Sequence, residues 1–149
     1  MSPLPFCKNK RYTEERMKSF LKTITPQPLI SYYHLLLAFL GAFRYGFPSR
    51  NLIVIGVTGT NGKSTTVEMA SQILREAGYK VASFSSIRFQ IGETAERNTL
   101  KMTMPGRFQT QQLLYNAAKK GCQYVVMEVT SEGILQHRHR FIRFHTAVF

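Results

Sequence analysis

The chain has 149 residues, 44% of them apolar, and a formal net charge of +12. This length predicts about one domain, and the apolar content excludes a chain that is disordered throughout. The charge fits a nucleic-acid or membrane partner, or simply an enzyme that handles anions. Because the positive residues form no single block and no RNA-binding aromatic motif occurs, we expect no nucleic-acid partner. Two cysteines are too few for a disulfide framework and favour a reducing cytoplasm.

The first fifty residues predict a basic helical segment in front of a separate domain over residues 51–149. They contain eight lysine and arginine residues but only two glutamates. Two helices are expected, one over about residues 13–24 and one from Pro28 to about Tyr45.

An apolar run over residues 29–43 forms most of the second expected helix. The run is shorter than the roughly 20 residues that a helix needs to span a bilayer. It predicts either a helix that packs on the following domain or a basic amphipathic helix, peripheral at the inner face of the membrane. Both interpretations are compatible with the sequence.

From residue 51 onward, short apolar strands alternate with amphipathic helices. This alternation predicts an α/β fold of the P-loop NTPase type, with a doubly wound and mainly parallel sheet. The chain ends inside an expected buried strand, so we expect it to be part of a longer protein. The expected elements are strands over residues 52–57, 80–85, 124–129 and 145–149, helices over 63–77 and 107–119, a hairpin through 87–91 followed by a polar loop to 106, and at most a short helix over 133–140.

The first of these strands leads into a loop with two glycines, and a helix begins at its end. The loop and the helix start comprise Gly59, Thr60, Asn61, Gly62, Lys63, Ser64 and Thr65. This order predicts a site for the phosphates of ATP, where backbone N–H groups and a helix N-terminus face the anion. Lys63 is expected to reach the β- and γ-phosphates, and the Ser64 hydroxyl to bind Mg²⁺. The strict pattern G-x-x-x-x-G-K-[ST] fails, because Val57 stands five positions before Gly62.

Glu128 stands near the carboxyl end of the apolar strand expected over residues 124–129. Ligands of open α/β sheets bind outside the carboxyl ends of the strands. We therefore expect Glu128 to hold Mg²⁺, directly or through water, next to the phosphate loop. The alternative is a carboxylate that only accepts hydrogen bonds from loop amides.

A polar cluster that includes Ser131, Gln136 and Arg138 follows this strand. The Arg138 guanidinium is suited to bind a carboxylate or a phosphate of a second substrate with two hydrogen bonds. A solvated basic loop is an equally good interpretation. His137 and His139 do not predict a zinc site, because no cysteine or carboxylate lies at ligand spacing.

Two segments resemble the Mur ligases, which form amide bonds in peptidoglycan precursor synthesis. Residues 56–66, GVTGTNGKSTT, resemble their ATP-binding signature. Residues 127–138, MEVTSEGILQHR, resemble the branch that adds the third amino acid to UDP-N-acetylmuramoyl-dipeptide. A weaker match lies at residues 98–106. The resemblance covers about residues 51–149 and implies part of the central ATP-binding domain of that family.

The resemblance implies a ligase that requires ATP and Mg²⁺. In such an enzyme a substrate carboxylate becomes an acyl phosphate, which the amino group of an amino acid then attacks. It implies catalytic roles for Lys63 and Glu128, with Ser64 and Glu128 as metal ligands. It also implies that a UDP-muramoyl-peptide contacts Thr103, Ser131, Gln136 and Arg138. Two alternatives remain, a related ligase of the folylpolyglutamate or cyanophycin synthetase type and an ATP-binding module without ligase chemistry.

Overall fold

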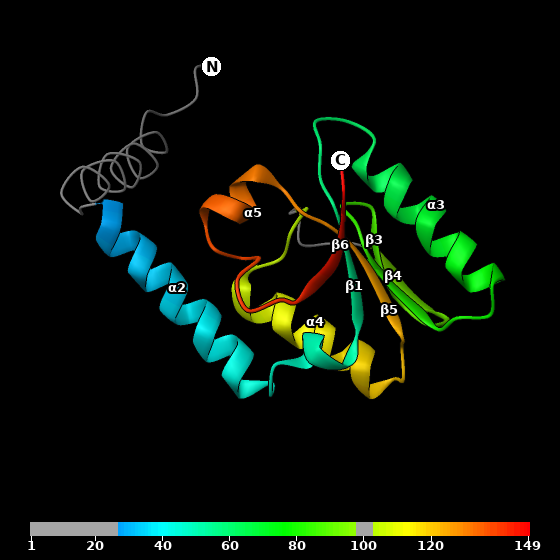
Figure 1. Ribbon diagram of the computed structural model, residues 1–149, viewed down its shortest axis with the longest axis horizontal. Coiled ribbons are helices and arrows are strands. Elements are labelled where there is room, and N and C mark those ends of the chain that lie inside the picture. Colours follow the sequence, from blue (N-terminus) through cyan, green and yellow to red (C-terminus); the bar gives the residue numbers. More distant parts are fainter. Residues whose placement is uncertain (1–26, 98–102) are drawn as a thin grey trace, which may run out of the picture. The chain divides into compact units, whose positions relative to one another are not determined.

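The computed structural model describes residues 27–97 and 103–149. The helix expected over residues 13–24 therefore lies outside the described residues. The described part contains a sheet with the strand order β4-β3-β2-β5-β1-β6 (Figure 1). Its strands are β1 (Ile53–Val57), β2 (Val81–Phe84), β3 (Arg88–Ile91), β4 (Thr94–Arg97), β5 (Tyr124–Glu128) and β6 (Phe144–Val148). The helices are α2 (Gln27–Arg44), the short 3-10 helix η2 (Pro48–Asn51), α3 (Lys63–Glu76), α4 (Arg107–Lys119) and α5 (Ser131–Leu135).

The sheet is mainly parallel. Strand β5 pairs in parallel with β1 and β2, and β6 pairs in parallel with β1. Strands β3 and β4 extend one edge with antiparallel pairing. The prediction of an α/β fold with a mainly parallel sheet is confirmed, and most expected elements begin and end within one or two residues of the observed ones.

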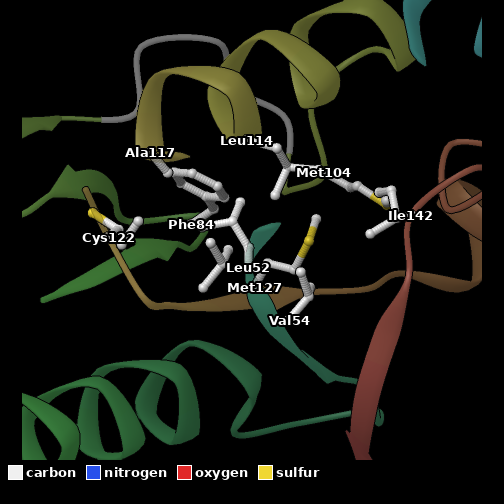
Figure 2. Packing of buried hydrophobic residues seen from close by; sticks show 11 residues of the cluster. Leu52, Val54, Phe84, Met104, Leu114, Ala117, Cys122, Met127 and Ile142 are labelled. Atoms are coloured by element: carbon white, nitrogen blue, oxygen red, sulfur yellow. The ribbon is translucent and has the colours of Figure 1, made fainter. Parts of the chain in front are cut away.

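Alternate residues of the central strands face two different cores. Val125 of β5 packs in the cluster that includes Leu114 of α4, and its neighbour Val126 packs in the cluster that includes Val67 of α3. Figure 2 shows the first cluster, in which Leu114 lies between helix α4 and the sheet. The period of two residues in a strand therefore places α3 and α4 on opposite faces of the sheet.

One expected loop contains a strand. Residues 94–97, expected to be part of a polar loop, form β4 at the edge of the sheet. Ile91 pairs with Thr94, so Gly92 and Glu93 are the two residues of a tight hairpin turn. Gly92 has φ 61, a conformation that favours glycine. A Gly-X pair after a strand is a hairpin signal, and it could have predicted β4.

The short helix begins and ends earlier than expected. It spans Ser131–Leu135 instead of lying within residues 133–140. The Thr130 side chain accepts a hydrogen bond from the backbone N–H of Gly133 at 3.0 Å and caps the helix at its N-terminus. The helix ends before His137, which has φ 55.

From His34 onward, α2 belongs to the same compact unit as the sheet. Its side chains Ala38 and Ala42 are buried, and the rings of Phe39 and Phe141 lie 5.5 Å apart in an edge-on arrangement. This part of the helix packs on the domain, as the first interpretation of the apolar run predicts. Among the described residues, no helix is long and apolar enough to cross a bilayer.

Gly56 lies in β1, between β5 and β6, where a side chain has no room. A Cβ atom there would lie 3.0 Å from two ring atoms of Phe144 and 3.3 Å from Val129. We expect Gly56→Ala to lower the free energy of unfolding by about 1–3 kcal/mol, because an overpacked core must shift. Urea denaturation measures this loss. The second substitution Phe144→Leu should recover part of it, and strictly additive effects of the two changes would contradict this explanation.

Candidate active site

The loops after β1, β2 and β5 meet at the end of the sheet where these three parallel strands terminate. Val57 pairs with Glu128, and Phe84 pairs with Met127, so the parallel strands end at nearly the same level. A cavity of about 250 Å³ opens at this carboxyl end of the strands. It is lined by Thr60, Asn61, Gly62, Lys63, Ser64, Thr65, Ser86, Thr103 and Glu128.

This cavity brings together residues that are far apart in the sequence. Six of the seven residues of the predicted phosphate loop line it, and so does the carboxylate predicted to bind metal. Thr103, predicted to contact the substrate, lies in the same lining. Sequence reasoning missed Ser86, which follows β2, because a serine after a strand has no distinguishing pattern.

The phosphate loop has the backbone that its glycines permit. Gly59 has φ 134 and Gly62 has φ 76, both in the region that disfavours residues with a Cβ. The Lys63 ammonium donates hydrogen bonds to the carbonyl oxygens of Gly59 at 2.9 Å and of Thr60 at 3.0 Å. Gly62 is the N-cap of α3 and offers no side chain to cap it. The first N–H groups of α3, which have no intrahelical partner, are thus available to an anion.

The two oxygens of Glu128 have different surroundings. The residue is only 1% exposed. Its Oε1 accepts hydrogen bonds from the Ser86 backbone N–H at 3.0 Å and from the Ser86 hydroxyl at 3.3 Å. Its Oε2 is buried and has no hydrogen-bond partner among the described residues. The loop-amide interpretation therefore accounts for one oxygen and leaves the other for a metal.

The residues present fit a magnesium ion. A buried carboxylate oxygen without a partner costs free energy unless a cation or a donor compensates it. The Ser64 hydroxyl borders the same cavity, and Mg²⁺ prefers oxygen ligands. Among the described residues, no group of three or more His, Cys, Asp or Glu side chains could hold a metal. A cation here would take its remaining ligands from phosphate and water, as Mg²⁺ usually does.

Of the residues after Glu128 that are predicted to contact a second substrate, Arg138 and Gln136 are hydrogen-bonded to each other. The Arg138 guanidinium donates to the Gln136 side-chain oxygen from Nε at 3.2 Å and from Nη2 at 2.8 Å, and it also donates to the backbone oxygen of Met104. Arg107 donates to the backbone oxygen of Gln136 at 2.8 Å. The interpretation as a solvated basic loop is therefore wrong for Arg138. Ser131 lies apart from this group, exposed in the first turn of α5.

Positive charge gathers around the same turn. Burial, followed by the positive charges of Arg107, His137 and Arg138, lowers the pKa of His34. Burial is also the main reason why the pKa of His139 is lowered. Burial is the main cause that favours the neutral form of both imidazoles, and the nearby positive charges add to it. Such charges favour an anionic ligand.

A larger cavity, of about 870 Å³, lies at the opposite end of the strands. Its lining includes Arg75 and Lys80, and also Gly78 and Lys120, which follow the C-terminal ends of α3 and α4. Basic side chains at helix C-termini compensate the negative end of the helix dipole. The smaller cavity at the carboxyl ends of the strands is therefore the candidate active site.

The family described as "Mur ligase middle domain" matches residues 57–149. This chain belongs to the Mur ligase family.

Two curated Mur ligases illustrate the similarity. The chain is 37% identical over 113 residues to the UDP-N-acetylmuramoyl-L-alanyl-D-glutamate--2,6-diaminopimelate ligase of Syntrophomonas wolfei, an alignment of 76% of this chain and 23% of that protein. It is 33% identical over 138 residues to the ligase of the same name from Buchnera aphidicola, covering 91% of this chain and 27% of that protein. The chain thus spans about a quarter of the length of these relatives.

A solved structure of a UDP-N-acetylmuramoyl-L-alanyl-D-glutamate--2,6-diaminopimelate ligase has the same fold. The TM-score is 0.58 at 26% identity, over 64% of this chain and 19% of that one. The names of these Mur ligases agree with the branch predicted from residues 127–138. The similarity extends further than expected, however. Residues 51–149 number only 99, so an alignment of 113 residues must include part of the segment before residue 51.

Proposed function

We propose that this chain is the ATP-binding part of a Mur ligase that joins a UDP-muramoyl-peptide to an amino acid in the cytoplasm. The observation that carries the proposal is the meeting of Lys63, Ser64 and Glu128 at one cavity. The start of α3 supplies Lys63 and Ser64, and the end of β5 supplies Glu128. Together they have the chemistry that a magnesium–nucleotide site requires.

The phosphate loop and Glu128 have distinct roles in this proposal. The loop from Gly59 to Thr65 forms a P-loop-like cradle and binds the ATP phosphates through its backbone N–H groups. Lys63 neutralises phosphate charge, while Ser64 and Glu128 hold Mg²⁺. When bound, Mg-ATP supplies the phosphoryl group that turns a substrate carboxylate into an acyl phosphate. The contribution of the chain is positioning and charge neutralisation, which carry most of the catalysis in phosphoryl transfer.

The muramoyl-peptide is proposed to approach from the side of Thr103 and the turn after α5. Thr103 lines the phosphate cavity. Gln136 and Arg138 are hydrogen-bonded to each other. Arg138 also belongs to the group of positive charges, with Arg107 and His137, that acts on His34. A substrate with a carboxylate and a diphosphate complements such a group. Ser131, exposed at the start of α5, is the remaining proposed contact.

Two measurements test the proposal. Calorimetric titration of the chain should show that ATP binds and that Mg²⁺ strengthens the binding. The longest product of the same gene should then form an amide from UDP-muramoyl-dipeptide and an amino acid, with release of phosphate. Turnover on a folate or cyanophycin substrate instead would favour the related ligases. ATP binding by that product without any amide formation would favour a non-catalytic module.

A peripheral membrane contact is a second proposal, supported by the outer face of α2. Leu36, Leu40 and Phe43 recur every three or four residues and are all exposed. They follow a strongly basic segment, as in helices that bind anionic membrane surfaces. Flotation with anionic liposomes, and not with neutral ones, would support this contact. Absence of flotation with either kind would exclude it.

A further inference from the structure

Ser86 connects two groups that the proposed function assigns to magnesium. It follows β2 and faces the cavity of the candidate active site. Its hydroxyl lies 2.8 Å from the Ser64 hydroxyl and 3.3 Å from Glu128 Oε1, and its backbone N–H donates to the same carboxylate oxygen at 3.0 Å. Ser86 thus contacts both proposed metal ligands, one on each side.

The direction of these hydrogen bonds follows from the number of hydrogens. A hydroxyl has one hydrogen to donate, and an ionised carboxylate only accepts. Since Ser86 donates to Glu128, the hydrogen between the two serines must come from Ser64. The lone pairs of the Ser64 oxygen that remain are then free for a cation. A metal ligand whose hydrogen is held by a neighbour is also a better electron donor.

The turn that carries Ser86 is anchored to the helix of the phosphate loop. Arg88, at the start of β3, donates from Nε to both carboxylate oxygens of Glu68 on α3, at 3.2 and 3.1 Å. Arg88 Nη2 lies 2.5 Å from Glu68 Oε2. Within the turn, the Ser85 hydroxyl accepts from the backbone N–H of Arg88 at 3.2 Å. The position of Ser86 is therefore set relative to α3, the helix that carries Ser64.

We propose that Ser86 is a positioning residue for the magnesium site. It holds Oε1 of Glu128, so that the other carboxylate oxygen stays directed to the cation, and it accepts the hydrogen of Ser64, so that the lone pairs of Ser64 face the same cation. The inference rests on the proposed function, because it requires that the cavity binds Mg-ATP. The proposal concerns the affinity of the site for Mg²⁺ and not its affinity for the nucleotide.

The test separates the affinity for Mg²⁺ from that for ATP. A fluorescent ATP analogue is bound to the full chain, and Mg²⁺ is titrated with the analogue at a fixed concentration. Ser86→Ala should raise the Mg²⁺ concentration for half-maximal binding about tenfold, as loss of a residue that orients a metal ligand usually does. Binding of the analogue in EDTA should be unchanged. Ser86→Thr, which keeps the hydroxyl at an exposed position, should restore the normal Mg²⁺ requirement.

Ser71→Ala is the matched control, because the Ser71 hydroxyl is buried on α3 and has no hydrogen-bond partner among the described residues. It should leave the Mg²⁺ requirement unchanged. An equal requirement in Ser86→Ala and wild type would overturn the role of Ser86 while Mg-ATP binding stands. A failure of Ser86→Thr to restore the requirement would also overturn it. No Mg-dependent binding by the wild type would overturn the proposed function and this inference together.

Discussion

Lys63→Ala is expected to weaken Mg-ATP binding by about 10- to 100-fold. A hydrogen bond to a charged group contributes about 1.5–3 kcal/mol, and each 1.4 kcal/mol changes an affinity tenfold. The Lys63 ammonium already bridges two loop carbonyls, at 2.9 and 3.0 Å, and it has a third donor for a phosphate oxygen. The substitution removes both the charge at the cavity and the bridge that holds the loop.

Isothermal titration calorimetry with Mg-ATP measures this effect. Lys80→Ala is the matched control, because Lys80 is an exposed lysine beside the cavity at the opposite end of the strands. It should bind Mg-ATP like the wild type. Thermal unfolding without nucleotide distinguishes loss of the ligand contact from loss of the fold. Unchanged affinity in Lys63→Ala would contradict the assignment of the phosphate loop.

Glu128→Gln is expected to have two effects of opposite sign. Without metal, the variant should be as stable as the wild type or more stable, by up to about 1–3 kcal/mol, because a buried and incompletely paired charge is removed. The amide oxygen of glutamine can still accept the bond from the Ser86 backbone N–H. The Mg²⁺-dependent part of ATP binding should be lost, because a neutral amide is a weak ligand for Mg²⁺.

Thermal unfolding in EDTA, and again in saturating Mg-ATP, measures both effects. The wild type should unfold at a higher temperature with Mg-ATP, and the variant should show little of this shift. Glu76→Gln, an exposed glutamate on α3 outside the cavity, should behave like the wild type in both conditions. A variant that is less stable in EDTA but keeps its Mg²⁺ response would show that Glu128 has a structural role only.

The central elements were predictable because their signals are local. The β-branched run before the phosphate loop predicts β1, and the apolar spacing after Lys63 predicts α3. The loop between them has glycines where φ is positive, at Gly59 and Gly62. Such patterns depend on residues within one element and its turn, so the sequence expresses them without reference to the rest of the chain.

The misplaced elements carry little signal within their own residues. Helix α5 begins at Ser131 because the Thr130 side chain caps it, and a threonine after a strand does not by itself indicate a cap. Strand β4 consists of Thr-Ala-Glu-Arg, which has no apolar alternation. Its strand conformation comes from pairing with β3 across a two-residue turn.

The sequence by itself determined the α/β class, the glycine loop before α3 and the carboxylate at the end of β5, because each depends on residue types at short spacing. Only the tertiary structure decided which groups share the site. The parallel register of β2 and β5 brings Ser86 to Glu128, although 42 positions separate them. The same fold gives Arg138 hydrogen-bond partners within the chain, Gln136 and Met104, where the sequence allowed a solvated loop. Contacts between distant segments arise from strand order and register, which a local pattern does not encode.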